Sequence, residues 1–136
     1  MKAGPTPNPR AAQVAGRVAA AQQRLMAALK LHGAAPAAGD YVRVADAALQ
    51  ADAVVGVRRE DEPPLTGWQI EPATLPIVAD APHGEYQLHE LAALRPAWIA
   101  ALALPPGWSF RCVGREIVDA VAPDGTRHVL TITVEA

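Results

Sequence analysis

The sequence predicts an α+β domain in which an antiparallel sheet of about four to six strands carries helices on one face, preceded by an N-terminal amphipathic helix. Near the start, Val14, Val18 and Leu25 recur at the spacing of one helix face. At the end, residues 127–136 alternate apolar and polar side chains, as a half-buried strand does. The 136 residues suffice for one core, and with only 4% aromatic residues that core is expected to be mainly aliphatic.

The N-terminal helix is expected over residues 10–32. Asn8 and Pro9 provide a capping side chain followed by a residue suited to the first turn, and Gly33 is a natural C-terminal stop. Residues 34–40 read as a linker. We therefore divide the chain into a lead, helix and linker over 1–39 and an α+β domain over 40–136. The sequence leaves open whether the helix packs on that domain or binds a partner.

Several further elements are expected between residues 41 and 136. Residues 41–50 begin as a short strand and become a turn of helix, and strands follow at 53–59 and 67–71. Residues 72–86 contain three prolines and are expected to be mostly irregular. Helix is expected from Leu88 to Leu104, divided at Pro96 because proline fits a first turn better than a helix interior. Strands at 108–113, 116–122 and 127–136 complete an antiparallel meander.

No residue pattern points to catalysis, a cofactor or a metal. The single cysteine, Cys112, alternates with Trp108 and Phe110, which favours a buried thiol. His83 and His89 are too loosely spaced to enforce a metal site. No secretory signal or run of about 20 apolar residues is visible, so a cytoplasmic location is expected. We therefore expect no enzyme, no bound metal or cofactor, no nucleic-acid partner and no membrane partner.

Charge is segregated along the chain although the net charge is only −2. Residues 1–39 carry five Lys or Arg residues and no acid, whereas residues 60–94 carry seven acids and no Lys or Arg. An acidic surface attracts basic protein partners, and aromatic anchors among charges are typical of interfaces. The residues that we predict to bind a partner are Glu60, Asp61, Glu62, Trp68, Glu71, Asp80 and Glu85. Trp68 also fits a second interpretation, as a core residue of its strand.

Two blocks of the sequence resemble a family of small bacterial immunity proteins. The first block holds an Arg-Glu pair at 59–60 and a Thr-Gly-Trp motif at 66–68, where the family typically has Ser-Gly-Trp. The second runs through Pro96, Ile99, Leu102, Pro105, Gly107, Phe110 and Arg111. The resemblance covers about residues 53–114. It departs from the family at Leu65, where Asp is usual, and after the Trp strand, where a Glu-Asp pair is reduced to Glu71.

The resemblance implies a binding function in bacterial competition. Such a protein neutralises a cognate toxin of a secretion system by binding it, here through the acidic segment to a basic surface. The alternative is an adaptor or secretion chaperone that docks through helix 10–32. Whether the protein forms a homo-oligomer stays open.

Overall fold

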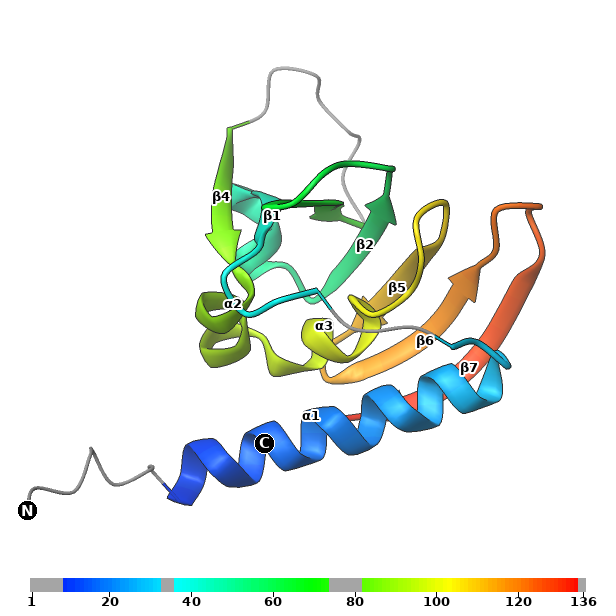
Figure 1. Ribbon diagram of the computed structural model, residues 1–136, viewed down its shortest axis with the longest axis horizontal. Coiled ribbons are helices and arrows are strands. Elements are labelled where there is room, and N and C mark those ends of the chain that lie inside the picture. The colour runs from blue at the N-terminus through cyan, green and yellow to red at the C-terminus, as the bar shows by residue number, and fades with distance from the viewer. Residues whose placement is uncertain (1–8, 33–35, 74–81, 135–136) are drawn as a thin grey trace, which may run out of the picture.

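The computed structural model describes residues 9–32, 36–73 and 82–134. Within these ranges the chain forms three α-helices, one 3-10 helix and a seven-stranded sheet (Figure 1). In chain order the elements are α1 (Pro9–Ala28), β1 (Tyr41–Ala45), η1 (Asp46–Gln50), β2 (Ala53–Arg58), β3 (Leu65–Pro72), β4 (His83–Gln87), α2 (Leu88–Leu94), α3 (Pro96–Ala101), β5 (Ser109–Val113), β6 (Glu116–Val121) and β7 (Arg127–Thr133).

The sheet is larger than predicted and it is mixed. Its strand order is β4-β1-β3-β2-β5-β6-β7, and β1 runs parallel to β3 while every other neighbouring pair is antiparallel. The α+β class is confirmed, but the expectation of four to six antiparallel strands is wrong. The sheet is mixed because β1 and β2, which η1 connects in the chain, are not neighbours. Strand β3 lies between them and runs parallel to β1. Side-chain alternation within a strand does not encode which strand becomes its neighbour.

Strand β4 is the element that the sequence pattern missed. Its residues, His83 to Gln87, are all half-buried or exposed, so they lack the alternation of a strand with one buried face. The segment was expected to be irregular. It is held instead by backbone pairing with β1, from Tyr41 opposite Gln87 to Ala45 opposite His83. An edge strand pairs with one neighbour only, and its side-chain pattern is therefore a weak predictor of the strand.

The core lies between the sheet and a helical layer. Val42, Val44, Ile70, Phe110 and Ile117 point from four strands into this layer and are almost fully buried. In the helical layer, α3 contacts both α1 and α2, while α1 also contacts β7 and α2 contacts β4 (Figure 1). The two short helices are separate, because α2 ends at Leu94 and Pro96 begins α3, as the sequence indicated.

Helix α1 packs its apolar face onto the rest of the domain. Ala21 and Leu25 are fully buried, Val18 and Met26 are nearly so, and all four belong to the same hydrophobic cluster as the sheet. The apolar face on which the adaptor alternative depends is therefore engaged within this chain. The face of α1 that remains exposed carries Arg17 and Arg24.

In the part of the chain that the structure describes, the opposite face of the sheet carries no α-helix (Figure 1) and mixes polar with apolar side chains. We call it the helix-free face; its cross-strand rows include Asp119 opposite Arg111 and Glu71 opposite Val55. Asp119 is buried and accepts hydrogen bonds from the guanidinium groups of Arg111, at 2.9 Å, and Arg127, at 3.0 Å. The guanidinium groups of these two arginines are therefore bound to a carboxylate of the sheet itself.

Candidate functional site

The loop between β2 and β3, residues 59–64, carries Glu60, Asp61 and Glu62, and we call it the acidic loop. All of its side chains are exposed. Its turn is closed by local hydrogen bonds: the backbone N–H of Glu62 donates to the Asp61 carboxylate at 2.9 Å, and the N–H of Leu65 donates to the carbonyl of Glu62 at 2.9 Å. The N–H of Tyr41 binds the Pro64 carbonyl at 2.7 Å and ties the loop to β1. The three carboxylates thus stand on a defined turn.

The Thr66-Gly67-Trp68 motif follows the acidic loop and fixes its C-terminal end by hydrogen bonds. The Thr66 hydroxyl donates to the Tyr41 carbonyl at 2.8 Å and accepts the backbone N–H of Trp68 at 3.1 Å. The Trp68 indole Nε1–H donates to the Leu102 carbonyl at the end of α3, at 3.0 Å. Its ring meets Phe110 edge-on, with centroids 5.3 Å apart. The motif therefore fastens the start of β3 to β1 and to the helical layer.

Gly67 is required by the close approach of the two strands at the base of the loop. Its φ is +82°, a value that side-chain-bearing residues rarely adopt. A Cβ at this position would lie 1.8 Å from the carbonyl oxygen of Arg59, a backbone atom. The N–H of Arg59 donates to the Gly67 carbonyl at 3.0 Å across the same contact. Only glycine permits this pairing without moving the loop.

Arg58 locks the base of the loop to the chain that follows α3. Its Nε donates to the Thr66 carbonyl at 2.9 Å and its Nη1 to the Leu104 carbonyl at 2.7 Å. The guanidinium carbon lies 5.9 Å from the centroid of the Trp68 ring, within reach of a cation–π contact. Burial lowers the pKa of Arg58, and the charge of Asp40 partly opposes that shift. Its donors face carbonyls, so Arg58 acts as a structural clamp.

Two further turns lie at the same end of the sheet. The N–H of Gly107 donates to the Arg58 carbonyl at 2.8 Å, and a Cβ at Gly107 would lie 2.9 Å from Cγ of Pro123. The turn at 122–126 therefore touches the 105–107 segment, which is bonded to the base of the acidic loop. This turn contributes Asp124, which is fully exposed; a hydrogen bond from the Thr126 N–H, at 2.8 Å, lowers its pKa and keeps it ionised. We call residues 59–65, 105–107 and 123–124 together the acidic end.

Asp124 is the site residue that the sequence analysis passed over. Its sequence, Pro-Asp-Gly-Thr at 123–126, is typical of a turn, but a turn pattern does not say which end of the sheet the turn occupies. Two exposed apolar side chains, Val57 at 44% and Leu65 at 41% exposure, flank the acidic loop. Exposed apolar side chains bordered by charged ones are typical of a protein interface, in which polar residues surround an apolar centre.

The residues predicted to bind a partner do not share one environment. Glu60, Asp61 and Glu62 are together and exposed, whereas Trp68 is only 2% exposed and occupies the core. The core interpretation of Trp68 is therefore the one that fits, because its ring is enclosed between β3, α3 and Phe110. As a side chain it supports the loop and has almost no surface for a partner.

Glu71 and Glu85 lie away from the acidic loop. Glu71 is buried at the opposite end of β3, where its carboxylate binds His83 Nε2 at 2.5 Å and the Gln69 amide at 2.7 Å. Glu85 is exposed on β4 and pairs across the strands with Arg43. Asp80 lies outside the described residues. The seven predicted residues thus do not form one continuous patch.

The described residues assemble no metal centre. Across 9–32, 36–73 and 82–134, no three His, Cys, Asp or Glu side chains are grouped to hold a metal ion. His89 bonds to Gln87 at 2.8 Å. Cys112 is buried, and burial together with the charge of Glu116 raises the pKa of its thiol to about 12. In the same part of the chain, no helix has the length and apolarity required to cross a membrane.

The fold and the acidic end define a small α+β domain that presents a firmly held, charged loop at one end of its sheet. Residues 21–123, well over half of the chain, match the Imm33-like domain family, and the chain belongs to that family. This is an immunity-protein family, and such proteins are generally not enzymes. The matched range runs from the middle of α1 to the turn after β6 and includes the whole acidic loop. No curated protein matches the chain, and no solved structure matches it either.

Proposed function

We propose that this protein is an immunity protein that binds a cognate secreted bacterial toxin and neutralises it in the cytoplasm of the cell that carries it. The binding surface is the acidic end. Three exposed carboxylates on a loop held by Gly67, Arg58 and Trp68 carry this proposal, and Asp124 adds a fourth acid at the same end. The partner surface is basic, as the active site of an enzyme acting on nucleic acid is.

The acids of the loop remain available for a partner. Among the described residues, the ion pairs join Asp119 to Arg111 and Arg127 and join Glu71 to His83. None of these pairs includes an acid of the loop. Charges of one sign that are left unpaired at a protrusion raise the association rate with an oppositely charged protein and strengthen the bound state. A preorganised loop also loses little conformational entropy on binding.

The interface that follows from this geometry is small and polar-rimmed. Leu65 and Val57 provide apolar contact next to the carboxylates, and the proline-rich turns at 105–106 and at Pro123 limit motion of the surrounding surface. In this arrangement Trp68 determines the position of the loop and makes no direct contact with the toxin. Glu71 is likewise a structural carboxylate, since it is enclosed with His83.

The test is a binding measurement with the protein encoded beside this one. The triple variant E60K, D61K and E62K is compared with a control that makes the same change in net charge at the exposed Asp46, Asp52 and Glu85. We expect the loop variant to weaken the Kd at least ~100-fold, because close charge pairs at interfaces contribute about 1.5–7 kcal/mol. We expect the control to change it less than about 5-fold, by long-range charge alone.

Two outcomes contradict the proposal. Equal losses in the loop variant and the control would place the interface elsewhere, and the absence of any binding or inhibition of the neighbouring product would remove the toxin partner. Circular dichroism spectra of both variants establish that each is folded before binding is compared.

A further inference from the structure

The first half of β7 is an unpaired edge of the sheet. Strand β7 is last in the strand order and pairs only with β6. Residues 127–129 keep one register with residues 119–121 of β6, and the irregularity in this pairing comes after them. In Figure 1 this half of β7 forms the outer border of the sheet, whereas Arg24 of α1 binds β7 at its other end. We call residues 127–129 the open edge.

The hydrogen bonds of the β6–β7 hairpin determine which way the backbone of the open edge points. The N–H of Ala122 donates to the carbonyl of Thr126 at 2.9 Å, so these residues form a hydrogen-bonded pair. Such pairs alternate with non-hydrogen-bonded pairs along antiparallel strands. His128 therefore bonds to β6, while the N–H and C=O groups of Arg127 and Val129 point away from the sheet. Across 9–32, 36–73 and 82–134, no backbone hydrogen bond from another element reaches these groups.

The side chains of the open edge provide apolar contact surface on the helix-free face. Val129 is 77% exposed there. The Arg127 guanidinium is held by Asp119, with Nε 3.0 Å from the carboxylate, so its aliphatic stem is fixed on the same face. The ring of His128 lies against Trp108, with centroids 5.7 Å apart, and packs on its own domain. An exposed β-branched side chain on an unpaired edge favours pairing with another polypeptide.

A second copy of this chain fits the open edge because the edge is self-complementary. In an antiparallel pairing centred on His128, Arg127 of each copy lies opposite Val129 of the other. The backbone groups of both residues point outward, so each of these pairs exchanges both of its main-chain hydrogen bonds. On the helix-free face, Val129 of one copy packs on the Arg127 stem of the other. A two-fold arrangement of this kind closes at two copies.

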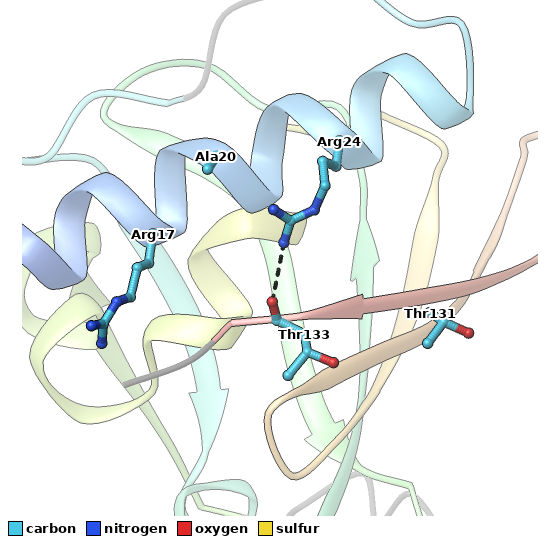
Figure 2. Close-up of a pocket in the computed structure, with 5 residues that line it drawn as sticks. All are labelled: Arg17, Ala20, Arg24, Thr131 and Thr133. Carbon is cyan, nitrogen blue, oxygen red and sulfur yellow. Dashed lines mark hydrogen bonds between the residues drawn. The ribbon is translucent and has the colours of Figure 1, made fainter.

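The charges beside the open edge are complementary in the same arrangement. Beyond Thr126, one copy continues towards the end of β7 in the second copy, and its Asp124 comes level with Thr133 there. At that point a groove of about 430 Å³ separates α1 from β7 (Figure 2). Its lining residues are Arg17, Ala20, Arg24, Thr131 and Thr133.

Arg24 has donors to spare for a carboxylate in this groove. Its Nη2 donates to the Thr133 carbonyl at 3.2 Å (Figure 2), and a guanidinium has five N–H groups. Asp124 is fully exposed on its turn, so its carboxylate is accessible to the Arg24 guanidinium of a second copy. The pairing of the strands and the pairing of the charges thus require the same two-fold arrangement.

Other arrangements match these charges less well. The sheet's second edge strand, β4, carries the exposed Glu85, and a two-fold pairing there would bring two Glu85 carboxylates together. At the open edge, a basic strand of an unrelated protein would meet Arg127, and an acidic strand would meet Asp124. A second copy presents both signs of charge in the order that this edge requires.

We propose that the protein forms a symmetric dimer in which β7 pairs with β7 of a second copy, and Asp124 of each copy binds Arg24 of the other. The interface is small, so we expect a Kd of about 10–100 µM. Of the acidic end only Asp124 takes part, and the acids at 60–62 stay exposed in the dimer. The proposal does not depend on a toxin.

The first test is sedimentation equilibrium of the full chain. We expect a monomer–dimer equilibrium between about 5 µM and 1 mM protein. Val129→Arg places a like charge beside Arg127 of the other copy and should weaken the dimer about 10-fold or more. The matched control is Val113→Arg, at a valine of β5 that is 45% exposed, and it should leave the Kd unchanged.

A double-mutant cycle tests the contact between Asp124 and Arg24. D124N and R24Q should each weaken the dimer about 5-fold, and the double variant should be no weaker than either single one, because both remove the same contact. The control variants D46N and R43Q change exposed residues away from the open edge and should have no effect. Losses that simply add in the double variant would overturn the pairing of Asp124 with Arg24.

Hydrogen exchange of individual amides reports whether the open edge is the dimer contact. Raising the protein concentration from about 5 µM to 1 mM should slow exchange at Arg127 and Val129 and leave Glu85, on the other edge strand, unchanged. Three results would overturn the dimer: a monomer at every concentration, a dimer without protection of these two amides, and a dimer that Val129→Arg does not weaken. All of these measurements use the protein alone, so their failure is separate from failure of the toxin-binding test.

Discussion

Replacing Trp68 by phenylalanine tests whether this residue is part of the core or of an interface. The change removes the Nε1–H donor and leaves the buried carbonyl of Leu102 without the hydrogen bond that it accepts at 3.0 Å. An orphaned buried acceptor costs about 1–3 kcal/mol. Weaker packing under the Arg58 guanidinium adds about 0.5–1 kcal/mol. We therefore expect W68F to lower the free energy of unfolding by about 2–3 kcal/mol.

The measurement is urea unfolding followed by far-ultraviolet circular dichroism, because removal of one tryptophan complicates a fluorescence comparison. A thermal melt should show the midpoint falling by roughly 6–15 °C, given about 3–5 °C per kcal/mol for a domain of this size. W68A should cost more, about 3–5 kcal/mol, because it also leaves a cavity. Val129→Ala is the control, since that side chain is 77% exposed and its loss should change stability by less than about 0.5 kcal/mol.

A W68F protein as stable as the native one would refute this reasoning. The indole would then not provide the support that its hydrogen bond and burial indicate. If such a stable variant also lost toxin binding, Trp68 would be a contact residue, and the structural interpretation of the Thr66-Gly67-Trp68 motif would fail with it.

Three further predictions concern residues outside that contact. Gly67→Ala should destabilise the domain by at least about 1–2 kcal/mol from its positive φ alone, and overlap with the Arg59 carbonyl should add to this; equal urea midpoints would contradict it. Burial raises the pKa of Cys112 to about 12, so its thiol should react with a thiol reagent at pH 8 only after unfolding. The protonated thiol should contribute its full stabilisation below pH 9.0 and lose it as the pH rises towards 12. Cys112→Ala should remove this part of the pH dependence of the free energy of unfolding. Asp119→Asn should cost about 1 kcal/mol, because its arginine partners are half-exposed, and the loss should shrink in high salt; a loss that is independent of salt would exclude the ion pair with Arg111 as its cause.

The sequence located the acidic loop but not the extent of the site. Adjacent acids between two strands are visible in the chain, and the exposure of Glu60, Asp61 and Glu62 agrees with that reading. Glu71 carries the same charge in the sequence, yet it is buried against His83, twelve residues away. The sequence carries no signal for that contact, because it depends on β1 pairing in register with β4 on one side and with β3 on the other.

The Thr66-Gly67-Trp68 motif shows the same division between pattern and geometry. The resemblance drew attention to these residues as a family signature, and their chemistry allowed either an anchor or a core role. The position of Leu102, 34 residues later, decides between the two, because it provides the acceptor for the indole. A tryptophan whose polar atom has a partner within the fold has no need of an external one.

The sequence by itself determined the helix and strand segments whose faces differ in polarity, the division of α2 from α3 at Pro96, and the separation of basic from acidic residues along the chain. These follow from periodicity and backbone stereochemistry, which act over a few residues. Only the tertiary structure decided that β3 lies between β1 and β2, that Glu71 is enclosed while Glu60 is free, and that α1 and β7 enclose a basic groove. Those features arise from contacts between residues far apart in the chain, where the geometry of the whole sheet determines which side chains meet.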